Sequence, residues 1–183
     1  MQVSNRRVSH DSTVTPVGDI TAHKIIVLLD ELLTHTLLLR DSYKSARCRT
    51  DIHFVPLRPL FDTHYKKQLA LVDVLVDRIR ALGGAGRVLA GAFLQGSPPS
   101  YTLRGHLAPH RLLSDLLDLH QIVLSAPHTA GTYGQQPDSA AAQDVAVNQV
   151  LLTNDEQACS VREQLVSLDQ ARGFAIANYS GRV

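Results

Sequence analysis

The sequence is poor in aromatic residues. Tryptophan is absent and aromatic residues make up only 5% of the 183 positions, whereas 44% are hydrophobic. A core with so few rings suits helices packed through Leu, Val and Ala better than an aromatic-rich β-sandwich. The length is that of one domain and is sufficient for a sizeable core. The composition therefore favours an all-α protein.

The sequence also lacks an excess of charge of either sign. Its 18 basic and 17 acidic residues give a net charge of +1 at pH 7, so the chain as a whole does not attract nucleic acid or anionic lipid. The longest apolar runs, such as Ile25 to Leu29, are too short to span a bilayer. No charged segment followed by an apolar one opens the chain. We therefore expect a cytoplasmic protein with no membrane partner.

Cysteines and nucleotide or hydrolase motifs are equally scarce. Cys48 and Cys159 lie far apart and belong to no Cys-x-x-Cys pair, so we expect two small reduced thiols in the core of a cytosolic protein. The Walker A, GxGxxG, GxSxG and HExxH patterns are missing, which removes the sequence support for a nucleotide-binding site, a serine hydrolase or a zinc protease.

What the sequence does contain is four stretches of helical periodicity, in which apolar residues recur every three or four positions. The stretches run from Asp19 or Thr21 to about Arg47, from about Phe54 to Leu82, from Pro109 to about Ala126, and from Asp138 or Ser139 to about Leu168. The predicted apolar face of the second comprises Phe61, Tyr65, Leu69, Val72, Val76 and Ile79. That of the fourth comprises Val145, Val147, Val150, Leu151, Cys159, Val161 and Leu165.

The links between these helices differ in length. Residues 83–105, rich in glycine and containing the pair Pro98-Pro99, form much the longest link. Four helices with one long crossover between the second and third describe a ferritin-like four-helix bundle. We expect residues 1–18 to form a flexible N-terminal arm, residues 19–170 the bundle, and residues 171–183 a C-terminal tail.

Three aspartates share one side of the second predicted helix. Asp62, Asp73 and Asp77 lie within about 60° of one another around a helix of 3.6 residues per turn. Lys66 follows Asp62 by four residues and Arg80 follows Asp77 by three, so ordinary ion pairs on a solvated face would explain them. The same side borders the apolar stripe, where a bundle or subunit interface would hold a cation. Spacing alone favours the solvated face and leaves the cation site open.

The stretch LRPLFDTHYKKQLALVDVLVDRIRALGG, residues 57–84, resembles the second helix of the Dps family, the mini-ferritins that protect starved cells. Members of that family read LHxLFD, then ELVDxLAER and LGG. KSARC, residues 44–48, resembles the family's KxxHW. The resemblance covers most of residues 20–170. It implies a homo-oligomeric cage, a dodecamer built from two-fold dimers, that sequesters iron, acts as a ferroxidase and protects against oxidative stress.

The resemblance also implies a metal site between subunits. In the family, two histidines and an aspartate come from one chain, and an aspartate and a glutamate come from its two-fold mate. Residue by residue, Asp62 and Asp73 match the two aspartates, and Asp77 stands at the glutamate position. These three residues are the expected iron ligands.

The two histidine positions of the family are not matched. They fall on Arg58 and on Arg47, or on Ala46 if the loop is aligned without a gap. Arginine offers no lone pair to Fe(II) and pairs well with carboxylates. Either the carboxylates keep a weak iron site, helped by His53 or His64, or Arg47 and Arg58 replace the metal in an intersubunit salt-bridge cluster. Charge favours the second interpretation.

DNA binding, the other activity of the family, is expected to be weak. The N-terminal arm offers only Arg6 and Arg7, and the tail only Arg172 and Arg182. Arms repeated over a dodecamer could still bind through avidity. The alternative to an iron cage is therefore a structural or DNA-associated oligomer, and a third possibility is a metal-free bundle that binds a protein partner.

The remaining histidines give weaker signals. His106 and His110 stand four apart, a spacing that can bind a metal, but Pro109 lies between them and no neighbouring carboxylate completes the set. The single histidines are expected on the surface or in hydrogen bonds. They are His10, His23, His35, His120 and His128.

Overall fold

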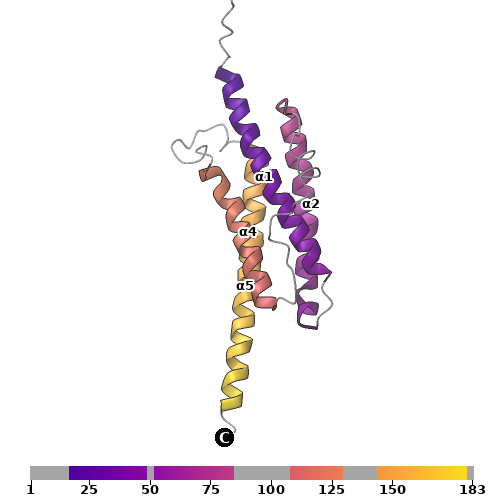
Figure 1. Ribbon diagram of the computed structural model, residues 1–183, viewed down its shortest axis with the longest axis vertical. Coiled ribbons are helices and arrows are strands. Elements are labelled where there is room, and N and C mark those ends of the chain that lie inside the picture. Colours follow the sequence, from indigo (N-terminus) through magenta and orange to yellow (C-terminus); the bar gives the residue numbers. More distant parts are fainter. Residues whose placement is uncertain (1–16, 49–51, 85–107, 130–143, 181–183) are drawn as a thin grey trace, which may run out of the picture.

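The computed structural model describes residues 17–48, 52–84, 108–129 and 144–180, and all regular structure in these ranges is helical. The elements are α1 (Val17–Arg47), the short 3-10 helix η1 (Ile52–Leu57), α2 (Arg58–Ala81), α4 (Pro109–Thr129) and α5 (Val145–Ser180). Their arrangement as a bundle confirms the predicted all-α, ferritin-like fold (Figure 1). None of these helices is long and apolar enough to cross a membrane.

The helices pair as α1 with α2 and α4 with α5, and the two pairs pack against each other. In Figure 1, α1 and α5 run downwards whereas α2 and α4 run upwards. Because α2 and α4 share a direction, the link between them has to return along the bundle, which is the single-crossover connectivity. Most of that link, residues 85–107, lies outside the described residues.

The core consists chiefly of leucine and valine from all four long helices. Each fully buried leucine contributes about 1.5 to 3 kcal/mol relative to an exposed one. Residues with no exposed surface include Leu28, Leu29, Leu32, Leu33, Leu39, Phe61, Leu75, Leu112, Leu113, Leu116, Val123, Val147, Val150 and Val161. Aromatic rings are few in this core, as the composition predicted.

The face that α2 buries differs from the predicted one. Leu69 is 41% exposed, and Tyr65 and Val76 are only half-buried. The buried residues are Phe61, His64, Gln68, Leu71, Val72, Leu75 and Ile79. The predicted stripe is therefore confirmed at Phe61, Val72 and Ile79 and wrong at its other three positions. Two polar residues, His64 and Gln68, are buried instead, and both find hydrogen-bond partners inside the core.

The ends of α2 follow the sequence signals. Pro59 lies in the first turn of α2, where a missing N–H costs least. The 3-10 helix η1 precedes α2, so the predicted single helix from Phe54 is two elements. At the other end Gly83 adopts a φ of +82°. The amide of Gly84 donates to the carbonyl of Ile79 at 2.8 Å, as in a glycine-terminated helix. The predicted stop at the glycine pair is confirmed.

The fourth helix, α5, begins and ends later than predicted. Asp144 caps it by accepting hydrogen bonds from the amides of Ala146 and Val147 at 2.9 and 3.3 Å. The caps expected from the sequence, residues 138 and 139, lie outside the described residues. The helix continues to Ser180 and extends beyond the level at which α4 starts (Figure 1). The predicted end near residue 168 was wrong because the helix continues through Gly173, and one glycine costs only about 1 kcal/mol in a helix.

Both cysteines are free and exposed, which corrects the expectation of core thiols. Cys48 directly follows the last residue of α1. Cys159 lies on the outer side of α5, next to the buried Ala158. Neighbouring positions on a helix point in different directions, so one residue separates core from surface here.

Candidate functional site

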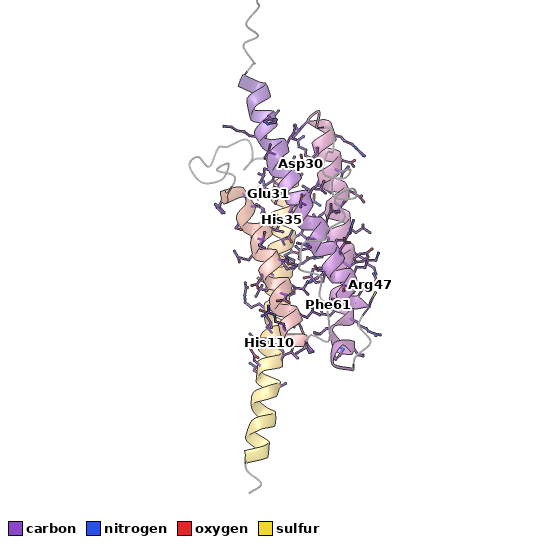
Figure 2. All side chains as sticks on the ribbon, in the orientation of Figure 1. Asp30, Glu31, His35, Arg47, Phe61 and His110 are labelled. Carbon is purple, nitrogen blue, oxygen red and sulfur yellow. The ribbon has the colours of Figure 1, made fainter. Side chains whose placement is uncertain are left out.

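The residues predicted to form the site lie on α2 and at the adjoining end of α1. Figure 2 shows Arg47 at the end of α1, beside α2. Asp62 belongs to the second turn of α2 and is half-buried, whereas Asp73 and Asp77 are exposed further along the same helix. Arg58, the first residue of α2, is also exposed.

Asp62 is held by two cations of its own chain. Lys66 Nζ lies 2.6 Å from Asp62 Oδ2, and Arg47 Nη1 lies 3.1 Å from Asp62 Oδ1. The hydrogen bond from Lys66, with weaker attraction from Arg47, lowers the pKa of the Asp62 carboxyl below its usual value. The predicted pair of Asp62 with Lys66 is confirmed, and the carboxylate is ionised at neutral pH.

Arg47 is fixed by a second contact as well. Its guanidinium lies over the ring of Tyr65, 4.8 Å from the ring centre. A guanidinium can stack on an aromatic face and bind a carboxylate at the same time, which a lysine does less well. Arg47 therefore joins the end of α1 to two residues of α2.

The three aspartates do not meet within one chain. Asp62 and Asp73 are eleven positions apart, about 16 Å along the helix axis. Asp77 pairs with Arg80 at 3.7 Å, as the spacing predicted. Across the described residues, no three His, Cys, Asp or Glu side chains lie close enough together to hold a metal ion. A site built from all three aspartates would therefore need a second copy of the chain.

His64 does not assist Asp62. It is 4% exposed, and its Nδ1 lies 3.0 Å from the hydroxyl oxygen of Tyr43 inside the bundle. Of His53, which belongs to η1, the structure describes only the backbone. The idea that His64 supplies a missing ligand at the surface is therefore wrong.

A second group of polar side chains, which sequence reasoning missed, lies in the core. We call it the core network; it consists of Tyr43 from α1, His64 and Gln68 from α2, His120 from α4, and Asn154 and Gln157 from α5. Burial, as the largest cause, lowers the pKa of both histidines to about 4, so both imidazoles are neutral at pH 7. The sequence signal that could have revealed the core network is the presence of these polar residues within otherwise apolar helical stretches.

The other predicted positions stay apart from both groups. His110, near the start of α4 (Figure 2), lies 3.4 Å from Asp169 of α5, so the structure supplies a carboxylate that the sequence did not reveal. Its proposed companion, His106, lies outside the described residues, as do Arg6 and Arg7. One imidazole beside one carboxylate, both substantially exposed, is an ordinary surface pair.

Comparison with known proteins gives two similar structures. DpsC from Streptomyces coelicolor is 30% identical, with a TM-score of 0.63 over 80% of this chain and 86% of that chain. Dps from Thermosynechococcus elongatus is 16% identical, with a TM-score of 0.57 over 81% of this chain and 94% of that one, and supports the fold alone. No protein-family model matches the sequence.

A curated sequence is also similar. An uncharacterized protein in the bpoA2 5′ region of Kitasatospora aureofaciens is 38% identical over 78 residues. These residues are 42% of this chain and 51% of that protein, so the match spans about half of the relative.

The likeness to DpsC extends over most of both chains and agrees with the helical order of the bundle. It also agrees with the motif in α2, from residue 57 to the glycine pair. The chain therefore belongs to the Dps family.

Proposed function

We propose that copies of this chain assemble into a Dps-like cage in the cytoplasm that sequesters iron and so protects against oxidative stress. We further propose that its intersubunit carboxylate site is a poor ferroxidase. The observation that carries this second part is the contact of Arg47 with Asp62 at 3.1 Å. Arg47 is the residue that falls on the family's first-helix histidine when the motif is aligned with a one-residue gap.

The chemistry of the donor set supports a slow reaction. Fe(II) needs oxygen or nitrogen atoms with free lone pairs. Both oxygens of Asp62 already accept bonds from cations, one from Arg47 and the other from Lys66. An iron ion entering beside Asp62 would meet two positive charges and would have to displace at least one of them. Asp62 therefore contributes little to iron binding at neutral pH.

Asp73 and Asp77 offer a different environment. Both are exposed, and at 3.7 Å the ion pair of Asp77 with Arg80 is loose. Facing a second copy across a two-fold axis, they could hold Fe(II) weakly or pair with the arginines of that copy. Iron would then enter the cage as cargo, and oxidation would proceed largely without a protein site.

The decisive experiment measures the rate of Fe(II) oxidation by hydrogen peroxide. The wild type should oxidise Fe(II) only slightly faster than buffer does, and the double variant Asp62→Asn, Asp73→Asn should match it. The double variant Arg47→His, Arg58→His restores imidazole donors and should raise the rate about 10-fold or more, the size of effect that changes around a metal have.

The matched control is Arg111→His, which makes the same exchange at an exposed position of α4, away from the three aspartates of α2, and should leave the rate unchanged. A wild type that oxidises Fe(II) far faster than the double asparagine variant would refute the slow-site proposal.

The second candidate function is a cage with no iron role, structural or DNA-associated. The paired charges of Asp62 and Arg47 favour it, because a pair that is already neutralised needs no metal. Iron content after loading separates the two candidates. Mass in solution separates both from a bundle that binds a protein partner. A gel shift at low salt, with and without residues 1–18, tests whether DNA is bound at all.

A further inference from the structure

The core network converges on the hydroxyl group of Tyr43, where three of the four long helices meet. The Tyr43 hydroxyl oxygen lies 2.7 Å from His120 Nε2 and 3.0 Å from His64 Nδ1. Tyr43 and His120 have no exposed surface. Two imidazoles thus share one phenol in an interior that is otherwise filled by leucine and valine.

The positions of the protons in this row of hydrogen bonds follow from Asn154, the residue at its end. Asn154 Nδ2 donates to the carbonyl of Val150 at 2.8 Å, which fixes the amide orientation and makes Oδ1 an acceptor. His120 Nδ1 lies 2.9 Å from that oxygen and must therefore carry the proton. The neutral ring then has a bare lone pair on Nε2, so the Tyr43 hydroxyl donates to His120. His64 Nδ1 must in turn donate to the Tyr43 oxygen.

Before any oxidation, all of these hydrogen-bonded side chains are uncharged. Burial raises the pKa of Tyr43 well above its usual value, so the phenol does not ionise. Burial also holds His120 in the neutral form, while its hydrogen bond to Asn154 favours the protonated form and partly opposes that effect. A neutral base 2.7 Å from a hydroxyl has the geometry for direct proton transfer.

We propose that Tyr43 and His120 form a redox-active pair, in which Tyr43 gives one electron to a strong one-electron oxidant outside the core while its hydroxyl proton moves to His120 Nε2. The O–H bond breaks and an N–H bond forms. The products are a neutral phenoxyl radical on Tyr43 and a protonated His120, and the oxidant is reduced by one electron. An external one-electron reductant reverses both transfers.

The chemistry of the pair explains why the base matters. Loss of an electron makes a phenol strongly acidic, so the proton must leave for the radical to be stable. No water is needed for this step, because His120 already accepts the bond and Asn154 Oδ1 can stabilise the N–H on the other side of the ring. His64 keeps donating to the Tyr43 oxygen before and after the transfer, so the radical oxygen remains hydrogen-bonded.

The composition and the position of the pair support the same inference. The sequence has no tryptophan to compete as an electron donor. Tyr65, the other tyrosine whose side chain is described, has a guanidinium over its ring, and that positive charge opposes loss of an electron. Tyr43 precedes Arg47 by one helical turn, so it lies beneath the candidate site on the same side of α1. The pair deepens the oxidative-stress part of the proposed function.

The test uses no iron, so its outcome is independent of iron uptake. A photogenerated ruthenium(III) tris-bipyridine complex serves as the oxidant, acting on the full chain with both exposed thiols alkylated, and electron paramagnetic resonance detects the radical. The wild type should give a tyrosyl signal. Tyr43→Phe, which keeps the ring and removes only the oxygen, should lose most of it, whereas the variant in which the other four tyrosines, Tyr65, Tyr101, Tyr133 and Tyr179, are all changed to Phe should retain it.

A matched pair of histidine variants tests the proton acceptor. His120→Gln removes the base and should lower the radical yield severalfold, while His64→Gln, which removes only a donor, should lower it much less. In D₂O the wild-type rate should fall severalfold, and the His120→Gln rate should change little. Thermal melting of each variant checks that it is folded. A signal that survives in Tyr43→Phe, or equal losses in the two histidine variants, would overturn the proposal.

Discussion

Two groups of polar side chains in this molecule differ in their access to water. One is the surface group, formed by Asp62, Arg47 and Lys66, and the other is the core network. On the outer side of α2, Asp62 keeps its charge because Arg47, Lys66 and solvent surround it. In the core network, His64 and His120 have lost theirs because burial disfavours an ion. The surface group is held together by attraction between ions, and the core network is held together by hydrogen bonds between ordered donors and acceptors. The two should therefore differ in how strongly they respond to substitution, pH and salt.

The core network should be the more sensitive of the two to substitution. Asn154→Ala removes the acceptor for His120 Nδ1, which is left buried without a partner, and one of the two acceptors of Gln68 Nε2, which keeps its bond to Gln157. We expect the free energy of unfolding to fall by about 3 kcal/mol, from the unpaired donor and the cavity together. Urea unfolding at equal protein concentration measures the change.

The matched control for this prediction is Gln149→Ala, which removes an exposed amide from the same helix. Its effect should stay within about 0.5 kcal/mol. Equal losses in the two variants would show that the core network adds nothing beyond helix propensity.

Acid should weaken the core network before it affects the surface group. His120 has a folded pKa of about 4, below the unfolded value of 6.5, so the folded state disfavours the proton that the unfolded state binds. The resulting stability is complete above pH 6.5 and is lost as the pH falls from 6.5 towards 4. The loss attributable to His120 should approach about 3 kcal/mol, from 1.36 kcal/mol per pKa unit.

Thermal unfolding across this pH range measures the slope of the free energy of unfolding against pH. The groups that face His120 are Tyr43, His64 and Asn154, of which only His64 also titrates in this window. His120→Gln should therefore reduce the slope and leave the part due to His64. An unchanged slope in His120→Gln would assign the acid sensitivity to other groups.

The surface group should show the smallest effect on stability. A double-mutant cycle on Asp62 and Arg47, with Asp62→Asn and Arg47→Gln, should give only a small coupling, because both side chains are 38% exposed and water screens the pair. The coupling should shrink as salt is raised. Asp77 with Arg80, more exposed and 3.7 Å apart, provides the comparison and should couple more weakly. A large coupling that is independent of salt would mean that water does not screen the pair.

Much of the fold could be predicted from periodicity, and the exceptions have physical causes. Leucines at three and four residue intervals located α1 almost to the residue, because its buried face is nearly all apolar. The buried face of α2 was misplaced because His64 and Gln68 are satisfied by residues of other helices, which no local pattern shows. The end of α5 was missed because helix formers around Gly173 outweigh the cost of one glycine.

The candidate site, too, could be predicted from the sequence only in part. Local pairs such as Asp62 with Lys66 follow from spacing on one helix, and the structure confirms them. The contact of Arg47 with Asp62 depends on how α1 packs on α2, and only family resemblance suggested it. The core network could not be predicted, because Tyr43 and His120 meet only after four helices assemble.

The most direct test of the proposal that Arg47 occupies the metal's place is a crystal of the protein soaked in Fe(II), with anomalous diffraction measured at the iron edge. No iron peak should appear at Asp62, and the guanidinium of Arg47 should still contact the Asp62 carboxylate. Any iron near the two-fold interface should be weak and confined to Asp73 and Asp77. An iron peak bound by Asp62, with Arg47 displaced, would contradict the claim that arginine has taken the place of the metal.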